Sequence, residues 1–147
     1  MRSWTGAPAD PETEVGGVGW IRAVEWVPYQ LPTFVTPAFA GYVSGHSTFS
    51  RAAAEVLTGL TGTPYFPGGL ASWTVEEGAL LHEEGPTSDV ELQWATYYDA
   101  SDQAGISRLY GGIHIPQDDI EGRITGSQVG LAAWELAQTY FDGTAES

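Results

Sequence analysis

The sequence contains no cysteine and no lysine. Without cysteine the chain has no disulfide and no thiolate metal site, and its redox compartment cannot be inferred. Its basic side chains are five arginines and three histidines, set against 19 aspartates and glutamates, and its net charge is −14. Nucleic acids and anionic membrane surfaces are bound by basic patches, so this composition excludes both as partners. Any anion that the chain binds must be held by a few cations gathered locally.

Long apolar runs are also missing. No stretch has the length of a membrane span, and the N-terminal residues contain no apolar segment of a signal peptide. We therefore interpret the chain as soluble and leave its compartment open, including secretion of a longer parent protein. With 147 residues, of which 42% are hydrophobic, it has enough material for one packed domain. Residues 1–17, rich in glycine, proline and acidic side chains, are predicted to be a flexible lead-in.

Two segments have the apolar spacing of helices. Residues 46–60 repeat apolar side chains at helical intervals and are followed by Gly62 and Pro64, which favour a helix end. Residues 116–141 begin with a proline, which suits the first turn of a helix. The inward face of this second helix is predicted to consist of Ile120, Ile124, Leu131 and Trp134.

The other segments complete a mostly α fold, a helical bundle with one small β-hairpin. Residues 74–92 place apolar residues around an acidic Gly-Pro turn, which predicts the hairpin. A further helix is expected at residues 91–103, with Asp89 as a candidate cap, and residues 61–73 are expected to form a loop. Prolines earlier in the chain exclude a long helix there and leave room for one helical turn near residues 20–26.

The tripeptide Ser44-Gly45-His46 stands where the first predicted helix begins. A helix N-terminus presents unpaired N–H groups and the positive end of the helix dipole, so it attracts anions. Gly45 allows a ligand to approach the backbone, Ser44 adds a hydroxyl donor, and His46 can exchange protons near neutral pH. These parts suit an oxyanion cradle. The alternative is an ordinary serine cap followed by an incidental histidine.

A second group, the Arg-His-Asp group, consists of Arg108 after Ser107, then His114 and Asp118. Arginine is the preferred planar donor to phosphate-like oxygens. His114 and Asp118 are four residues apart, so they are expected to share one helix face, where the carboxylate accepts from one ring nitrogen and leaves the other free. The alternative is a surface arginine beside an ordinary helix start. This spacing is more specific than the tripeptide.

The two groups together resemble known motifs. The tripeptide resembles the second motif of the type-2 phosphatidic acid phosphatase superfamily, and the Arg-His-Asp group matches every fixed position of its third motif. The surrounding segments SGHSTFSRAAAEVL and SRLYGGIHIPQDD are similar to the vanadium-dependent haloperoxidase branch. The resemblance covers roughly residues 37–132 and implies a helical bundle of the haloperoxidase and acid phosphatase type.

The resemblance also implies roles for these residues. His114 is then the apical ligand of vanadium, bound as vanadate, or the phosphoryl nucleophile of a phosphatase that binds phosphate. His46 is then the general acid and base, and Asp118 orients His114. The oxygens of the anion are then bound by Ser44, Gly45 and Arg108. In a haloperoxidase the substrates are hydrogen peroxide and a halide or small organic molecule, and bound vanadate activates peroxide to oxidise halide to hypohalous acid.

The sequence departs from the superfamily pattern in two places. Val43 replaces the usual proline before the tripeptide, and a first motif, a lysine followed later by Arg-Pro, is missing. A multiply charged oxyanion needs several cations, so we expect this chain to be the C-terminal piece of a longer enzyme whose upstream segment supplies them. The alternatives are a soluble phosphatase and an inactive helical module. Apolar surface left by a partial bundle makes a homo-oligomer a further expectation.

Other candidate sites are weaker. His82 beside Glu83 and Glu84 is interpreted as a solvated turn, because adjacent side chains diverge and rarely share one metal ion. The acidic residues at 118, 119 and 121 lack the pattern of a calcium-binding loop. Arg51 and Glu55, four residues apart, are predicted to form an ordinary surface ion pair.

Overall fold

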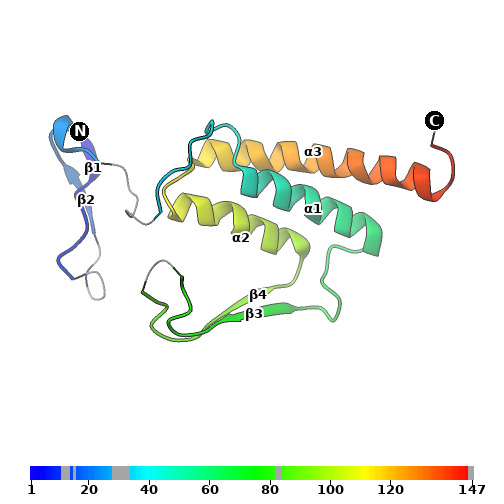
Figure 1. The fold of residues 1–147 in the computed structure, drawn as a ribbon, viewed down its shortest axis with the longest axis horizontal. Helices are drawn as coiled ribbons and strands as arrows, with labels where there is room; N and C mark the ends of the chain where they lie inside the picture. The colour runs from blue at the N-terminus through cyan, green and yellow to red at the C-terminus, as the bar shows by residue number, and fades with distance from the viewer. Residues whose placement is uncertain (11–13, 15, 28–33, 82–83, 146–147) are drawn as a thin grey trace.

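A computed structural model describes residues 1–10, 14, 16–27, 34–81 and 84–145 of the chain. Within these ranges three helices, α1 (Gly45–Thr61), α2 (Tyr97–Tyr110) and α3 (Pro116–Phe141), lie side by side, with α1 between the other two (Figure 1). The mostly α fold predicted from the sequence is confirmed. The start of α1, the end of α2 and the start of α3 all lie at the same end of the bundle (Figure 1).

Local signals place the ends of α1 and the start of α3. The Ser44 side chain caps α1 by accepting a hydrogen bond from the backbone N–H of Ser47. Gly62 ends the helix in the left-handed region, at φ 70°, which glycine adopts without steric cost. Pro116 occupies the first turn of α3, where its missing N–H costs no helical hydrogen bond. The predictions for residues 46–60 and 116–141 are therefore confirmed.

The helix predicted at residues 91–103 is wrong in its first half. Val90–Trp94 is strand β4, which pairs antiparallel with β3 (Ala71–Val75), so the predicted hairpin is confirmed. Strand β3 begins at Ala71, inside the segment 61–73 that was expected to be a loop. Helix α2 begins only at Tyr97. Its cap is Thr96 rather than Asp89, because Thr96 and Asp99 form a reciprocal capping box.

A second hairpin lies beyond the end of the bundle where α1 begins (Figure 1). Strand β1 (Arg2–Trp4) pairs antiparallel with β2 (Val18–Trp20). Part of the expected lead-in is therefore a strand, and its flexibility stays a prediction. The short 3-10 helix η1 (Ala23–Glu25) confirms the predicted helical turn.

Glycines bring α1 and α3 together. The face of α3 that contacts α1 contains Gly122, Gly126 and Gly130, and a Cβ built at Gly126 would lie 2.3 Å from the carbonyl oxygen of Thr48. The predicted inward stripe is wrong for three of its four residues, because Ile120 is 54% exposed and Ile124 and Leu131 are each about half exposed. The fourth, Trp134, does face α1 and lies against Gly59. Glycine carries no hydropathy signal, so the face of closest approach is invisible to apolar periodicity.

The buried interior is small and largely polar. Its buried apolar members are Ala54, Tyr97 and Ile113, whereas the predicted apolar face of α1 is partly open to solvent, with Phe49 77% exposed. The buried polar side chains are Ser44, Ser47, Ser101, His114, Asp118 and Asp119. Most of them lie near the end of the bundle that carries both motifs. Among the described helices, none has the length and apolarity needed to cross a membrane.

Candidate oxyanion-binding site

The tripeptide lies at the N-terminus of α1. Ser44 has no exposed surface, and its backbone N–H donates to the carbonyl oxygen of Asp118 at 3.1 Å. This bond ties the start of α1 to the start of α3. Gly45 is the first residue of α1, so its N–H has no partner within the helix and is available to an anion. The serine is thus an ordinary cap, as the alternative interpretation held, and is also part of the contact between the two motifs.

His114 is held in one orientation. Its side chain is only 2% exposed, and its Nδ1 lies 2.9 Å from Oδ2 of Asp118. The ring stacks on Phe39, with centroids 5.5 Å apart. His114 precedes α3, so the expected contact with Asp118 is made from the turn before the helix and not along one helix face. Because Asp118 occupies Nδ1, the second ring nitrogen, Nε2, remains to bind a ligand.

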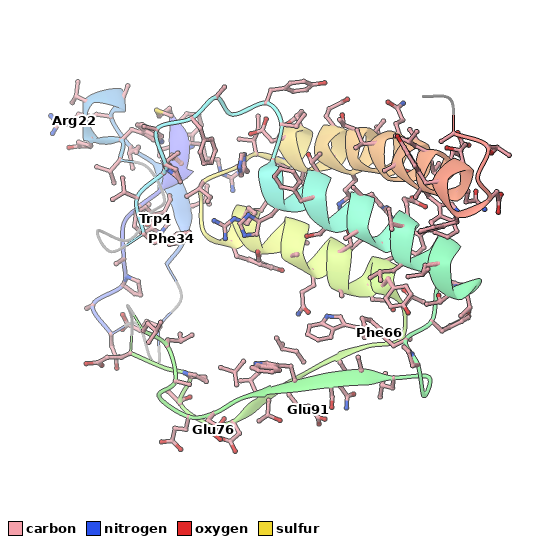
Figure 2. The ribbon with its side chains drawn as sticks, turned by 45° about the vertical axis from the view of Figure 1, so that its right-hand side comes forward. Trp4, Arg22, Phe34, Phe66, Glu76 and Glu91 are labelled. Carbon is pink, nitrogen blue, oxygen red and sulfur yellow. The ribbon has the colours of Figure 1, made fainter. Side chains whose placement is uncertain are left out.

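Arg108 lies near the end of α2, and its backbone carbonyl accepts a hydrogen bond from the N–H of Ile113 at 3.2 Å. Its guanidinium carbon lies 5.2 Å from the ring centroid of Phe34, a residue at this end of the bundle (Figure 2). Burial lowers the pKa of Arg108. The buried Nε has no hydrogen-bond partner among the residues that the structure describes. A buried donor left unpaired is costly, so this nitrogen fits a site for an anion. Ser107 donates its hydroxyl to the Ala104 carbonyl at 2.7 Å.

His46 connects the two motifs electrostatically. Although His46 is an exposed residue, partial loss of surrounding water lowers its pKa, and the positive charges of Arg108 and His114 lower the pKa further. Together with the hydrogen bond from the Ser44 N–H to the Asp118 carbonyl, this influence indicates that the basic side chains of the two motifs lie near one another. Such a concentration of positive charge is what an otherwise acidic chain needs in order to hold an oxyanion.

The pKa of His46 should rise toward its ordinary value of about 6.5 when Arg108 is replaced by alanine. Part of the depression is expected to remain, because desolvation is its largest cause. In the folded wild-type chain the pKa lies below that of the unfolded chain, so His46 contributes stability that is present above about pH 6.5 and is lost as the pH falls. An NMR titration of the ring protons measures the pKa directly. An unchanged value in the variant would contradict the proximity of these groups.

Several polar residues near the site were not predicted as part of it. Ser47 donates its hydroxyl to Oδ1 of Asp119 at 2.7 Å, and Arg123 binds both carboxylate oxygens of Asp119, with Nε 3.0 Å from Oδ1 and Nη2 2.9 Å from Oδ2. The spacing of four residues between Asp119 and Arg123 was a visible signal for their pair. The bond from Ser47 joins residues 72 positions apart and has no local signal.

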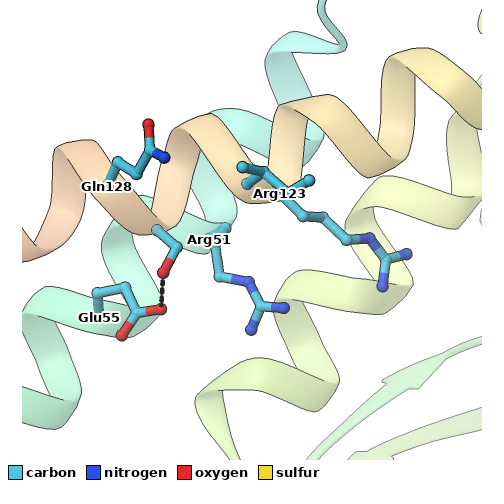
Figure 3. A pocket seen from close by; sticks show the side chains of 6 residues that line it. Arg51, Glu55, Arg123 and Gln128 are labelled. Carbon is cyan, nitrogen blue, oxygen red and sulfur yellow. Dashed lines mark hydrogen bonds between the residues drawn. The ribbon is translucent and has the colours of Figure 1, made fainter.

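The predicted ion pair between Arg51 and Glu55 is wrong. Arg51 instead lies 3.7 Å from Asp102 and stacks on Tyr98, because α2 offers both partners across the bundle. Glu55 accepts hydrogen bonds from Tyr98 at 2.6 Å and from Ser127 at 2.7 Å. The two residues line an open cavity of about 420 Å³ (Figure 3). The other residues of its lining are Arg123, Ile124, Ser127 and Gln128.

The weaker candidates gain no support. His82 and Glu83 lie outside the described residues. The carboxylates of Asp118 and Asp119 are engaged by His114 and Arg123. In the part of the chain that the structure describes, no group of three or more histidine, aspartate or glutamate side chains is arranged to hold a metal ion.

The fold is similar to that in two solved structures of bacterial vanadium-dependent chloroperoxidase. An apo-type bacterial vanadium-dependent chloroperoxidase has a TM-score of 0.72 and 24% identity, and the match covers 99% of this chain and 29% of that one. For a holo-type structure the TM-score is 0.69 and the identity 23%, with 95% and 27% covered. The chain thus spans less than a third of the length of these chloroperoxidases. At such identities the likeness shows the fold alone.

The family follows from a comparison of sequence. No curated protein matches the chain. The family model described as the VCPO second helical-bundle domain matches residues 1–143, beyond the range of about 37–132 to which the motifs pointed. VCPO denotes the vanadium chloroperoxidases, so the predicted resemblance to the haloperoxidase branch is confirmed. Because the match covers nearly the whole sequence, the chain belongs to the family of VCPO second helical-bundle domains.

Proposed function

We propose that this chain binds vanadate at the end of the bundle where α1 and α3 begin, and that it serves halide oxidation by hydrogen peroxide. The observation that carries the proposal is the burial of the His114 ring and its contact with Asp118. Its ring is buried and oriented by Asp118 through Nδ1, which leaves Nε2 as the ligand atom. The influence of Arg108 and His114 on the pKa of His46 supports a shared pocket of positive charge.

The residues present fit a tetrahedral oxyanion. Arg108 has a buried Nε without a partner among the described residues, and the Gly45 N–H is free at a helix N-terminus. Ser44 has no exposed surface, so an oxyanion contacts its hydroxyl only when the residues that cover Ser44 move aside. In our proposal His114 binds vanadium, and the oxygens are bound by Ser44, Gly45 and Arg108.

The protein groups act through protons and charge. Asp118 contacts Nδ1 of His114 and thereby orients the ring so that Nε2 faces the ligand. His46 is mainly neutral near pH 7, because its pKa lies below the ordinary value, so it accepts a proton from a substrate and returns it. Arg108 balances negative charge. When bound, vanadate supplies the Lewis acidity that activates hydrogen peroxide toward halide.

The same arrangement fits a soluble phosphatase. There His114 attacks phosphorus through Nε2 while the bond from phosphorus to the leaving oxygen breaks, and the protonated fraction of His46 donates its proton to that oxygen. The two functions share every residue named above and therefore differ in reaction and not in the binding site. Family membership favours the haloperoxidase. An upstream segment with further cations, as expected from the missing lysine motif, would strengthen either activity.

The proposal is tested by measuring vanadate binding first and bromination activity second. The 147-residue chain is titrated with orthovanadate by calorimetry, and bromination of a phenol dye is then followed with bromide and peroxide. Binding that is lost in His114→Ala, with bromination that depends on vanadate, is expected. Hydrolysis of phosphate esters without bromination would replace the first proposal by the phosphatase. Absence of both vanadate and phosphate binding would favour an inactive module.

A further inference from the structure

A buried chain of polar groups runs from Ser44 to Arg123. The hydroxyl oxygens of Ser44 and Ser47 lie 2.9 Å apart, and the Ser47 hydroxyl lies 2.7 Å from Oδ1 of Asp119. Ser44 and Ser47 have no exposed surface, and Asp119 is 6% exposed. With water excluded, the protons of these groups must be shared among the groups themselves.

The charge of Asp119 determines where the Ser47 proton lies. Arg123 donates to both carboxylate oxygens of Asp119 and also pairs with Asp102 at 2.9 Å, so the Asp119 carboxylate is ion-paired with a guanidinium. Ser47 has one hydroxyl proton and two acceptors within reach. The anionic oxygen is the closer and the stronger acceptor, so Ser47 donates to Asp119.

The direction of the Ser44 hydroxyl proton follows from that of Ser47. Two hydroxyl oxygens 2.9 Å apart need one proton between them, and Ser47 has already given its own to Asp119. The Ser44 proton must therefore point toward Ser47. One lone pair of Ser44 accepts the backbone N–H of Ser47 at 3.3 Å. A single lone pair remains, and Ser44 can offer a ligand only an acceptor.

We propose that Asp119, acting through Ser47, is a positioning residue that makes the Ser44 hydroxyl a hydrogen-bond acceptor. The oxyanion site then prefers an anion that carries a proton on one oxygen, such as hydrogen vanadate or hydrogen phosphate. A tetrahedral anion such as tungstate carries no proton at neutral pH. Its oxygen would face the lone pair of Ser44 and would form no hydrogen bond there. This inference rests on the proposed oxyanion site and defines the protonation state of its ligand.

The test compares Ser47→Ala with the wild-type chain. Alanine keeps the Cβ of serine and removes the acceptor of the Ser44 proton, which becomes free to turn toward the ligand. Dissociation constants for tungstate and for vanadate are measured at pH 7 by calorimetry. We expect the preference for vanadate over tungstate to fall by about tenfold in the variant, the effect of one hydrogen bond to an anion.

Ser127→Ala is the matched control. The Ser127 hydroxyl also donates to a carboxylate between α3 and α1 at 2.7 Å, in this case to Glu55, and it has no bond to Ser44. Both variants are expected to lower the melting temperature by a similar amount, and only Ser47→Ala should change the preference between the anions. Asp119→Asn, which weakens the acceptor of the Ser47 proton, should shift the preference in the same direction and replaces Ser47→Ala if that variant does not fold.

The outcomes separate the two proposals. A wild-type chain that binds neither vanadate, phosphate nor tungstate overturns both. Wild-type binding with the same preference in Ser47→Ala overturns the positioning role alone and leaves the oxyanion site intact. If Ser47→Ala and Ser127→Ala changed the preference for vanadate over tungstate equally, the cause would be general loosening of the bundle. That result would also overturn the role of Asp119.

Discussion

Replacing Arg108 with alanine is expected to weaken vanadate binding by about a hundredfold. The guanidinium is partly buried, and its Nε has no partner among the described residues, so its bonding capacity is available to a ligand. A charge-assisted bond in such surroundings is stronger than one at the surface, because water competes less. The chain has few other cations to take its place. Calorimetric titration with orthovanadate measures the loss.

Arg22→Ala provides the comparison. The Arg22 side chain is 79% exposed and pairs with Glu25 next to η1, a segment that contains none of the proposed site residues. Removing it changes the net charge by the same amount as removing Arg108, so it controls for the general effect of one positive charge. Equal affinities in the two variants would mean that the anion is held by the overall field of the protein. The Arg-His-Asp group would then not be its site.

Gly126→Ala is expected to destabilise the folded chain by about 3 kcal/mol and to lower the melting temperature by about 10 °C. The new Cβ would lie 2.3 Å from the Thr48 carbonyl oxygen and 3.0 Å from the Arg51 Cβ. A backbone carbonyl within a helix cannot turn aside, so α1 and α3 must separate. The gain in helix propensity from glycine to alanine, about 1 kcal/mol, offsets only part of this cost. Thermal unfolding followed by circular dichroism tests the expectation.

Gly17→Ala is the corresponding control, since a Cβ at Gly17 meets no heavy atom within 4 Å and its φ is not positive. We expect this substitution to change the melting temperature by no more than a degree or two. A stable Gly126→Ala chain would show that the two helices can move apart freely. The contact between Ser44 and Asp118, which joins the two motifs, would then be adjustable as well.

The features that could be predicted from the sequence are those formed between residues close together in the chain. The cap at Ser44, the first-turn proline of α3 and the contact of His114 with Asp118 all follow from side chains within four residues of their partners. Such contacts depend on backbone geometry that is nearly the same in every helix start. The start of α2 was missed because apolar side chains at 90–94 suit a strand as well as a helix, and only the pairing with β3 decides between them.

Tertiary structure decided how the helices meet. The glycines of α3 set the closest approach to α1, and that approach brings Ser47 to Asp119 and His46 to the cations Arg108 and His114. Glycine has no apolar signal, and a bond across 72 residues has no local period. The sequence by itself identified the residues that we propose to bind the anion. Their distances and burial come from helix packing, because these depend on atoms that the chain brings together only when it folds.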